Sequence, residues 1–75
     1  MLRSGPYRFF FYGGDASEPP RIHVERDDCE CKFWLDPIRF ERSEGFRSRD
    51  IQLIQSLVEQ HQEMFSEAWN EFFGG

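Results

Sequence analysis

Apolar and polar residues alternate most clearly between Glu18 and Pro37. In the segment from Arg21 to Arg26, Ile22 and Val24 alternate with polar side chains. After Asp27-Asp28 the alternation resumes, with one face formed by Cys29, Cys31, Phe33 and Leu35 and the other by Glu30, Lys32 and Trp34. A period of two is the signature of a half-buried strand. The pattern predicts two antiparallel strands, and the absence of glycine between them leaves the length of their turn open.

Three other segments complete the expected sheet. Tyr7 to Tyr12 is a strand with aromatic residues on both faces, so its second face is expected to be covered or to contribute to a partner surface. The six residues before it read as a loose lead-in. Glycine and proline between Gly13 and Pro20 predict an exposed connection. Ile38 to Glu41 is expected to form a short additional strand.

From Ser48 the period becomes helical. Apolar residues and one histidine recur at alternating spacings of three and four positions: Ile51, Ile54, Val58, His61, Phe65, Ala68 and Phe72. Ser48 is the expected cap, and Gly74-Gly75 ends the pattern, which predicts a helix over residues 48–73. A straight helix of this length would be roughly 36 Å long, whereas four strands span less than about 20 Å. A break near His61 and an alignment along the strands therefore stay open.

These elements define one α+β domain over residues 1–75. It contains a three- to four-stranded, mainly antiparallel sheet (residues 7–41) followed by a long C-terminal helix (48–73). A chain this short buries only about 60% of the surface that its unfolded form exposes. The 13 aromatic residues enlarge the core that it can build, and an interface would add to it.

The net charge of −5 lies entirely in the C-terminal segment. All nine basic residues fall within positions 1–49, where nine acidic residues balance them, and residues 50–75 hold five acidic residues and no Lys or Arg. Glutamates at helical spacing (Glu59, Glu63, Glu67 and Glu71) repel one another mildly. Because this row borders Trp69, Phe72 and Phe73, we expect a protein partner with a basic, partly apolar surface there, with plain solvent as the alternative. The three aromatic residues are also a candidate homodimer surface.

The polar strand face holds the candidate chemistry, formed by His23, Glu25, Lys32 and Trp34. Histidine titrates near neutrality and serves as a general acid or base; the alternative is a hydrogen-bonded structural face. His23 with Cys29 and Cys31 also suggests zinc. However, the C-x-C spacing is unusual for zinc and no fourth ligand is evident, so we expect no metal or cofactor and place both cysteines, reduced, in the core.

Arginines gather around the turn before the helix, at Arg39, Arg42, Arg47 and Arg49. They are candidate phosphate contacts, although the acidic net charge does not favour nucleic acid and the chain's own carboxylates are the alternative partners. No apolar run approaches the roughly 20 residues that span a bilayer, and the N-terminus lacks the apolar core of a signal peptide. We therefore expect a cytoplasmic protein without a membrane partner.

Several runs closely resemble a small bacterial family called domain of unknown function 4160. They are YRFFFYGG, EPPRIHVE and CKFWLDP, followed by GF and a helix containing EAWNEFF, and they cover almost the whole chain. Two departures matter. Arg21 stands where the family usually has His, which argues against a two-histidine site. Arg47 and Asp50 stand where the family often has Ser and Glu, which weakens the expected helix cap.

The resemblance implies a gene that lies beside one for another small domain, in the layout of a toxin–antitoxin module. Similar family members are regarded as candidate toxins that the neighbour neutralises by direct binding. The function expected on this basis is a toxin-like component, with candidate catalytic residues His23, Glu25 and Lys32 and candidate partner-binding residues Trp34, Glu63, Glu67, Trp69, Phe72 and Phe73. The alternative is a non-catalytic protein-interaction module or transcriptional co-regulator. Whether the chain is an enzyme stays open.

Overall fold

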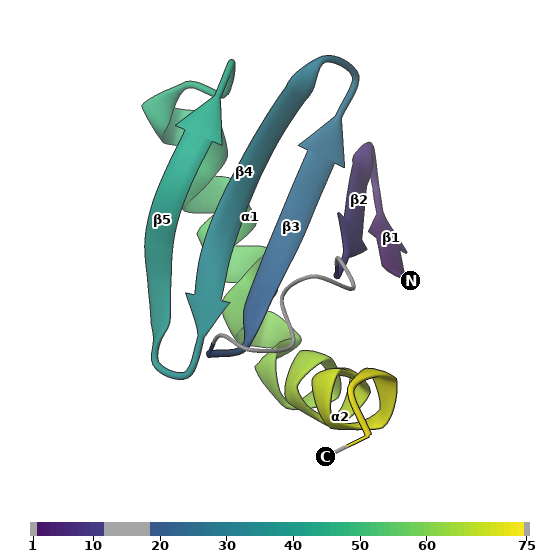
Figure 1. The fold of residues 1–75 in the computed structure, drawn as a ribbon. Helices are drawn as coiled ribbons and strands as arrows, with labels where there is room; N and C mark the ends of the chain where they lie inside the picture. The colour runs from purple at the N-terminus through teal and green to yellow at the C-terminus, as the bar shows by residue number, and fades with distance from the viewer. Residues whose placement is uncertain (1, 12–18, 75) are drawn as a thin grey trace.

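The computed structural model describes residues 2–11 and 19–74. Tyr12 and most of the expected connection from Gly13 to Pro20 lie outside the described residues. Within the described part, five strands form one sheet in chain order (Figure 1): β1 (Leu2–Ser4), β2 (Tyr7–Phe10), β3 (Arg21–Arg26), β4 (Cys29–Leu35) and β5 (Ile38–Glu44). Every neighbouring pair is antiparallel, so the α+β class and the antiparallel sheet are confirmed.

The expected number of three to four strands is wrong, because the described residues form five. The segment interpreted as a lead-in contains β1, which pairs with β2 from Leu2 opposite Phe9 to Ser4 opposite Tyr7. Gly5 adopts a φ of 58° in the tight turn between them, a conformation that glycine allows without strain. Strand β5 also extends past the expected Glu41 to Glu44, with an irregularity in its pairing opposite Lys32 and Phe33.

The turn between β3 and β4 contains only two residues, since Arg26 pairs directly with Cys29. Asp27 takes a φ of 52° there. A short polar side chain tolerates this left-handed conformation better than most residues, so the hairpin closes without glycine.

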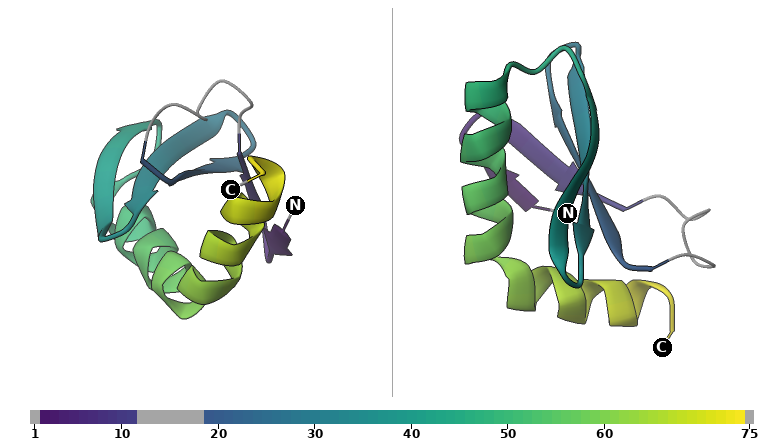
Figure 2. Two further views of the ribbon diagram at one scale, coloured as in Figure 1. Left: turned by 60° about the horizontal axis from the view of Figure 1, so that its bottom comes forward. Right: turned by 90° about the vertical axis from the view of Figure 1, so that its left-hand side faces the viewer.

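A single helix over residues 48–73 is also wrong: the segment forms α1 (Ser48–Gln60) and α2 (Gln62–Phe72). The break falls at His61 (φ −110°, ψ 17°), which confirms the alternative of a break near that residue. Helix α1 lies along one face of the sheet, and α2 turns beneath the strand ends towards the opposite face (Figure 2). The turn buries apolar surface that a straight helix would leave in water, because Phe65 stacks on Phe9 with ring centroids 5.4 Å apart.

The start of α1 differs from the expected one by one residue. The cap position is Arg47, and Ser48 is the first helical residue. The Asp50 carboxylate accepts a hydrogen bond of 3.3 Å from the Arg47 backbone N–H. Because a guanidinium has no acceptor atom, Arg47 cannot return this bond, so only half of a capping box forms.

The core lies between the sheet and the two helices. Its buried apolar residues are Tyr7, Phe9, Phe11, Ile22, Val24, Cys31, Phe33, Leu35, Phe46, Ile54, Val58, Phe65 and Trp69. The core position expected for Cys31 is confirmed. Burial, assisted by the negative charge of Glu30, raises the pKa of the Cys31 thiol to about 12, so the thiol stays protonated at neutral pH. Cys29 is only partly buried, and both cysteines are free thiols.

Candidate functional site

The sheet face turned away from α1 carries the polar residues singled out above, and we call it the open sheet face. Strand pairing places Phe10 opposite His23, His23 opposite Lys32 and Lys32 opposite Arg42. These four residues therefore form one row across β2, β3, β4 and β5. The structure thus brings the candidate residues His23 and Lys32 side by side.

His23 is nevertheless only 1% exposed. Its ring stacks on Phe10, with centroids 5.6 Å apart and an interplanar angle of 19°. The Arg8 guanidinium lies 5.1 Å from the centroid of the same Phe10 ring. A general acid or base must reach its substrate directly or through one water. In this conformation, therefore, His23 packs against Phe10 and is closed to a substrate.

Glu25 lies one row further along β3, between Arg8 on β2 and Glu30 on β4. Its carboxylate accepts a 2.7 Å hydrogen bond from Arg8. The Arg8 side chain is 51% exposed and that of Glu25 is 35% exposed, so solvent screens the pair and it contributes little to stability. The pair also holds the Arg8 guanidinium beside the Phe10 ring. Glu25 is thus connected, through Arg8, to the ring that stacks on His23.

Trp34 occupies the other end of the open sheet face and is half-buried. The Arg21 guanidinium lies 5.2 Å from the Trp34 ring centroid. Nη1 of Arg21 also donates to both carboxylate oxygens of Glu41, at 2.9 and 3.2 Å. Arg21 thus forms an ion pair and packs against Trp34.

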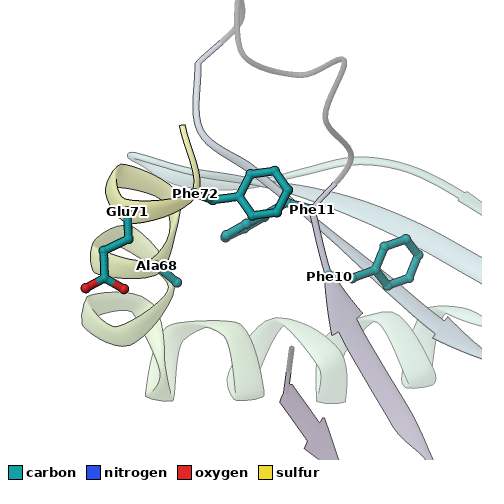
Figure 3. A pocket seen from close by; sticks show the side chains of 5 residues that line it. All are labelled: Phe10, Phe11, Ala68, Glu71 and Phe72. Atoms are coloured by element: carbon teal, nitrogen blue, oxygen red, sulfur yellow. The ribbon is translucent and has the colours of Figure 1, made fainter. Parts of the chain in front are cut away.

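A cleft opens where the end of β2 meets α2, and we call it the aromatic cleft. It has a volume of about 500 Å³ and is lined by Phe10, Phe11, Ala68, Glu71 and Phe72 (Figure 3). That volume lies within the range of roughly 300 to 1,000 Å³ that is typical of ligand pockets. Because Phe10 also stacks on His23, the aromatic cleft adjoins the open sheet face.

The six candidate partner-binding residues differ in accessibility. Phe72 is 59% exposed in the aromatic cleft, and Glu63 and Glu67 are exposed on α2. Trp69 is buried, and its ring packs edge-on against Phe11 with centroids 5.2 Å apart. Phe73 is half-buried and packs against Trp69 with centroids 4.2 Å apart. The structure therefore brings Phe72 to the surface and places most of Trp69 in the core.

Sequence reasoning did not select four residues of the cleft: Phe10, Phe11, Ala68 and Glu71. A signal for the first two was present, because aromatic residues on both faces of the Tyr7 to Tyr12 segment indicated either a covered face or a partner surface. Glu71 belongs to the glutamate row at which a partner was expected, and Ala68 belongs to the apolar stripe of the helix, but their position beside Phe10 and Phe11 depends on the turn between α1 and α2.

Among the described residues, His, Cys, Asp and Glu side chains form no group of three that could hold a metal ion. No helix in the described part of the chain combines the length and apolar character needed to cross a membrane.

Fold and site together define a small α+β domain whose exposed features are a polar sheet face and an adjoining aromatic cleft. The chain belongs to the family described as Domain of unknown function (DUF4160), whose family model matches residues 7–70. The expected family is thereby confirmed. No curated protein matches the chain, and no solved structure matches it.

Proposed function

We propose that this chain is the toxin-like component of a bacterial two-gene toxin–antitoxin module, acts in the cytoplasm and is neutralised by direct binding of a small protein encoded next to it. Membership of the DUF4160 family supports the module, through the gene layout that the resemblance implies. The observation that carries the binding step is the aromatic cleft with its exposed Phe72.

The cleft has the chemistry of a protein-binding surface. Burying a phenylalanine side chain contributes about 1.5 to 3 kcal/mol, and a few such anchors dominate the affinity of most interfaces. Glu71 lines the cleft, Glu63 and Glu67 are exposed on the same helix, and α2 contains no Lys or Arg. A partner with an apolar knob inside a basic rim matches both features, and its opposite charge accelerates encounter.

Phe10 supplies a route from binding to neutralisation. Its ring lines the aromatic cleft and stacks on His23, so a partner in the cleft also contacts the ring that packs on His23. We assign the toxic activity to that face, with His23, Glu25 and Lys32 as candidate catalytic groups and Trp34 as a candidate contact. Access to His23 requires the side chains that bury it, Phe10 among them, to move.

One observation favours a second function, a non-catalytic protein-interaction module or transcriptional co-regulator. His23 is almost fully buried in a stacked pair, which is the arrangement of a structural histidine. In that case the aromatic cleft alone carries the function. A second copy of the chain could bind the same surface, which would give a homodimer through Phe72 and Phe73.

Induced expression tests the proposal and separates these functions. Expression of the chain alone is expected to arrest growth, and co-expression of the neighbouring gene is expected to restore it. The variants His23→Ala and Lys32→Gln should abolish the arrest and keep the partner complex, provided that circular dichroism shows a folded protein. Unimpaired growth with a folded wild-type chain contradicts the toxin function, and a partner complex that persists in the same strain supports the interaction module.

A further inference from the structure

A second pocket, separate from the aromatic cleft, lies near the start of α1. It has a volume of about 580 Å³ and is lined by Tyr7, Arg26, Arg47, Arg49, Asp50 and Leu53, and we call it the arginine pocket. The start of α1 lies at the end of the molecule opposite α2 (Figures 1 and 2). The pocket is thus distant from the surface proposed for the protein partner.

Arg26 is held in place on one wall of this pocket. Its guanidinium carbon lies 5.4 Å from the ring centroid of Tyr7 and 5.3 Å from that of Phe46. Nη1 donates a 3.4 Å hydrogen bond to the Tyr7 hydroxyl, and Nη2 lies 3.8 Å from an Asp50 carboxylate oxygen. Two aromatic contacts fix the side chain before any ligand arrives, which lowers the entropic cost of binding.

Arg47 and Arg49 present the remaining positive charge. Both are exposed, and within residues 2–11 and 19–74 neither guanidinium forms an ion pair, in contrast to Arg42, which is paired with Glu44 at 2.7 Å. Three guanidinium groups therefore face one carboxylate, that of Asp50, and the pocket carries a net charge of about +2. The alternative that these arginines neutralise the chain's own carboxylates holds for Arg42 and does not hold for Arg47 and Arg49.

We infer that the arginine pocket binds a phosphate group carried by a nucleotide. A guanidinium offers paired N–H donors that match the oxygens of a phosphate. Leu53, whose side chain is 51% exposed, supplies an apolar wall for the remainder of the ligand. The pocket volume suits a ligand of nucleotide size. The phosphate comes either from a free nucleotide or from a nucleic-acid strand, and the chemistry of the site is the same for both.

Isothermal titration calorimetry at low ionic strength tests this inference with three probes: inorganic phosphate, adenosine 5′-monophosphate and a short single-stranded RNA. We expect saturable binding of at least one probe. The double variant Arg47→Gln/Arg49→Gln should weaken it by at least about tenfold, because hydrogen bonds to charged groups are lost. The double variant Arg39→Gln/Arg42→Gln removes the same two positive charges from β5, outside the pocket, and should leave the affinity unchanged.

The three probes also identify the source of the phosphate. Stronger binding of the mononucleotide than of the RNA indicates a free nucleotide, and stronger, salt-sensitive binding of the RNA indicates a nucleic-acid strand. Absence of saturable binding by all three probes overturns the inference. An equal loss of affinity in Arg39→Gln/Arg42→Gln overturns it as well, since the binding would then follow overall charge. A wild-type dimer that dissociates in the arginine double variant, without any probe binding, assigns the pocket to a second copy of the chain instead.

Discussion

The buried thiol of Cys31 makes the stability of the fold depend on pH in a defined window. Burial and the charge of Glu30 raise its pKa from 9.0 to about 12 in the folded protein. Between these values the thiol ionises in the unfolded chain and stays protonated in the folded one. The unfolded state then binds fewer protons than the folded state. The contribution of this thiol to the free energy of unfolding is therefore fully present below pH 9 and is lost as the pH rises towards 12. At about pH 10 the loss is about 1.4 kcal/mol.

Urea denaturation at about pH 8 and about pH 10, in the presence of a reductant, measures this loss. A domain of this size has roughly 4 to 11 kcal/mol of stability, so the change is well within reach of the method. The other titrating groups are common to the wild type and its variants. The informative quantity is therefore the difference between two proteins in the free energy of unfolding that each loses from about pH 8 to about pH 10. We expect Cys31→Ala to lose about 1.4 kcal/mol less than the wild type over this interval.

Cys29→Ala is the matched control. It removes a thiol from the same strand and retains the buried Cys31 thiol, so it should lose as much stability as the wild type. If Cys31→Ala and the wild type lose the same amount between the two pH values, the buried, protonated state of Cys31 is refuted.

Two further predictions concern packing and ion pairs. Phe65→Ala removes the ring that stacks on Phe9 and should cost about 3 to 5 kcal/mol, which lowers the melting temperature by more than about 10 °C in calorimetry; a change of only a few degrees contradicts the packing of α2. Glu41→Gln removes one carboxylate that accepts hydrogen bonds from Arg21 in a mostly buried pair and should cost about 1 kcal/mol or more in urea denaturation, whereas Glu44→Gln, in an exposed pair, should cost less than about 0.5 kcal/mol; equal costs would contradict this difference in burial.

Periodicity was sufficient to predict the strands that carry strong alternation. β3 and β4 match the segments expected around Asp27-Asp28, because one buried face fixes the register of each strand. β1 was missed because its three residues contain one apolar side chain, Leu2, and its formation depends on pairing with β2. Pairing between strands is a tertiary effect that no local pattern records.

The helix break and the candidate site depended on information that periodicity lacks. The apolar spacing continues unchanged through His61, so the pattern alone could not choose between one helix and two. The choice rests on contacts such as the 2.8 Å hydrogen bond from Gln62 Nε2 to the Leu35 carbonyl oxygen. His23 was placed on the polar face, and sequence alone did not indicate that it is almost fully buried there, with its ring stacked on Phe10, a neighbour that is distant in sequence.

The most direct test of the proposed function is the affinity between the purified chain and the protein encoded by the neighbouring gene. Phe72→Ala removes the exposed anchor of the aromatic cleft, and Met64→Ala truncates an exposed residue of the same helix outside the cleft. We expect calorimetry to detect a complex that Phe72→Ala weakens by at least about tenfold, which corresponds to about 1.4 kcal/mol, and that Met64→Ala leaves unchanged. Absence of a complex, or equal affinities for wild type and Phe72→Ala, would contradict it.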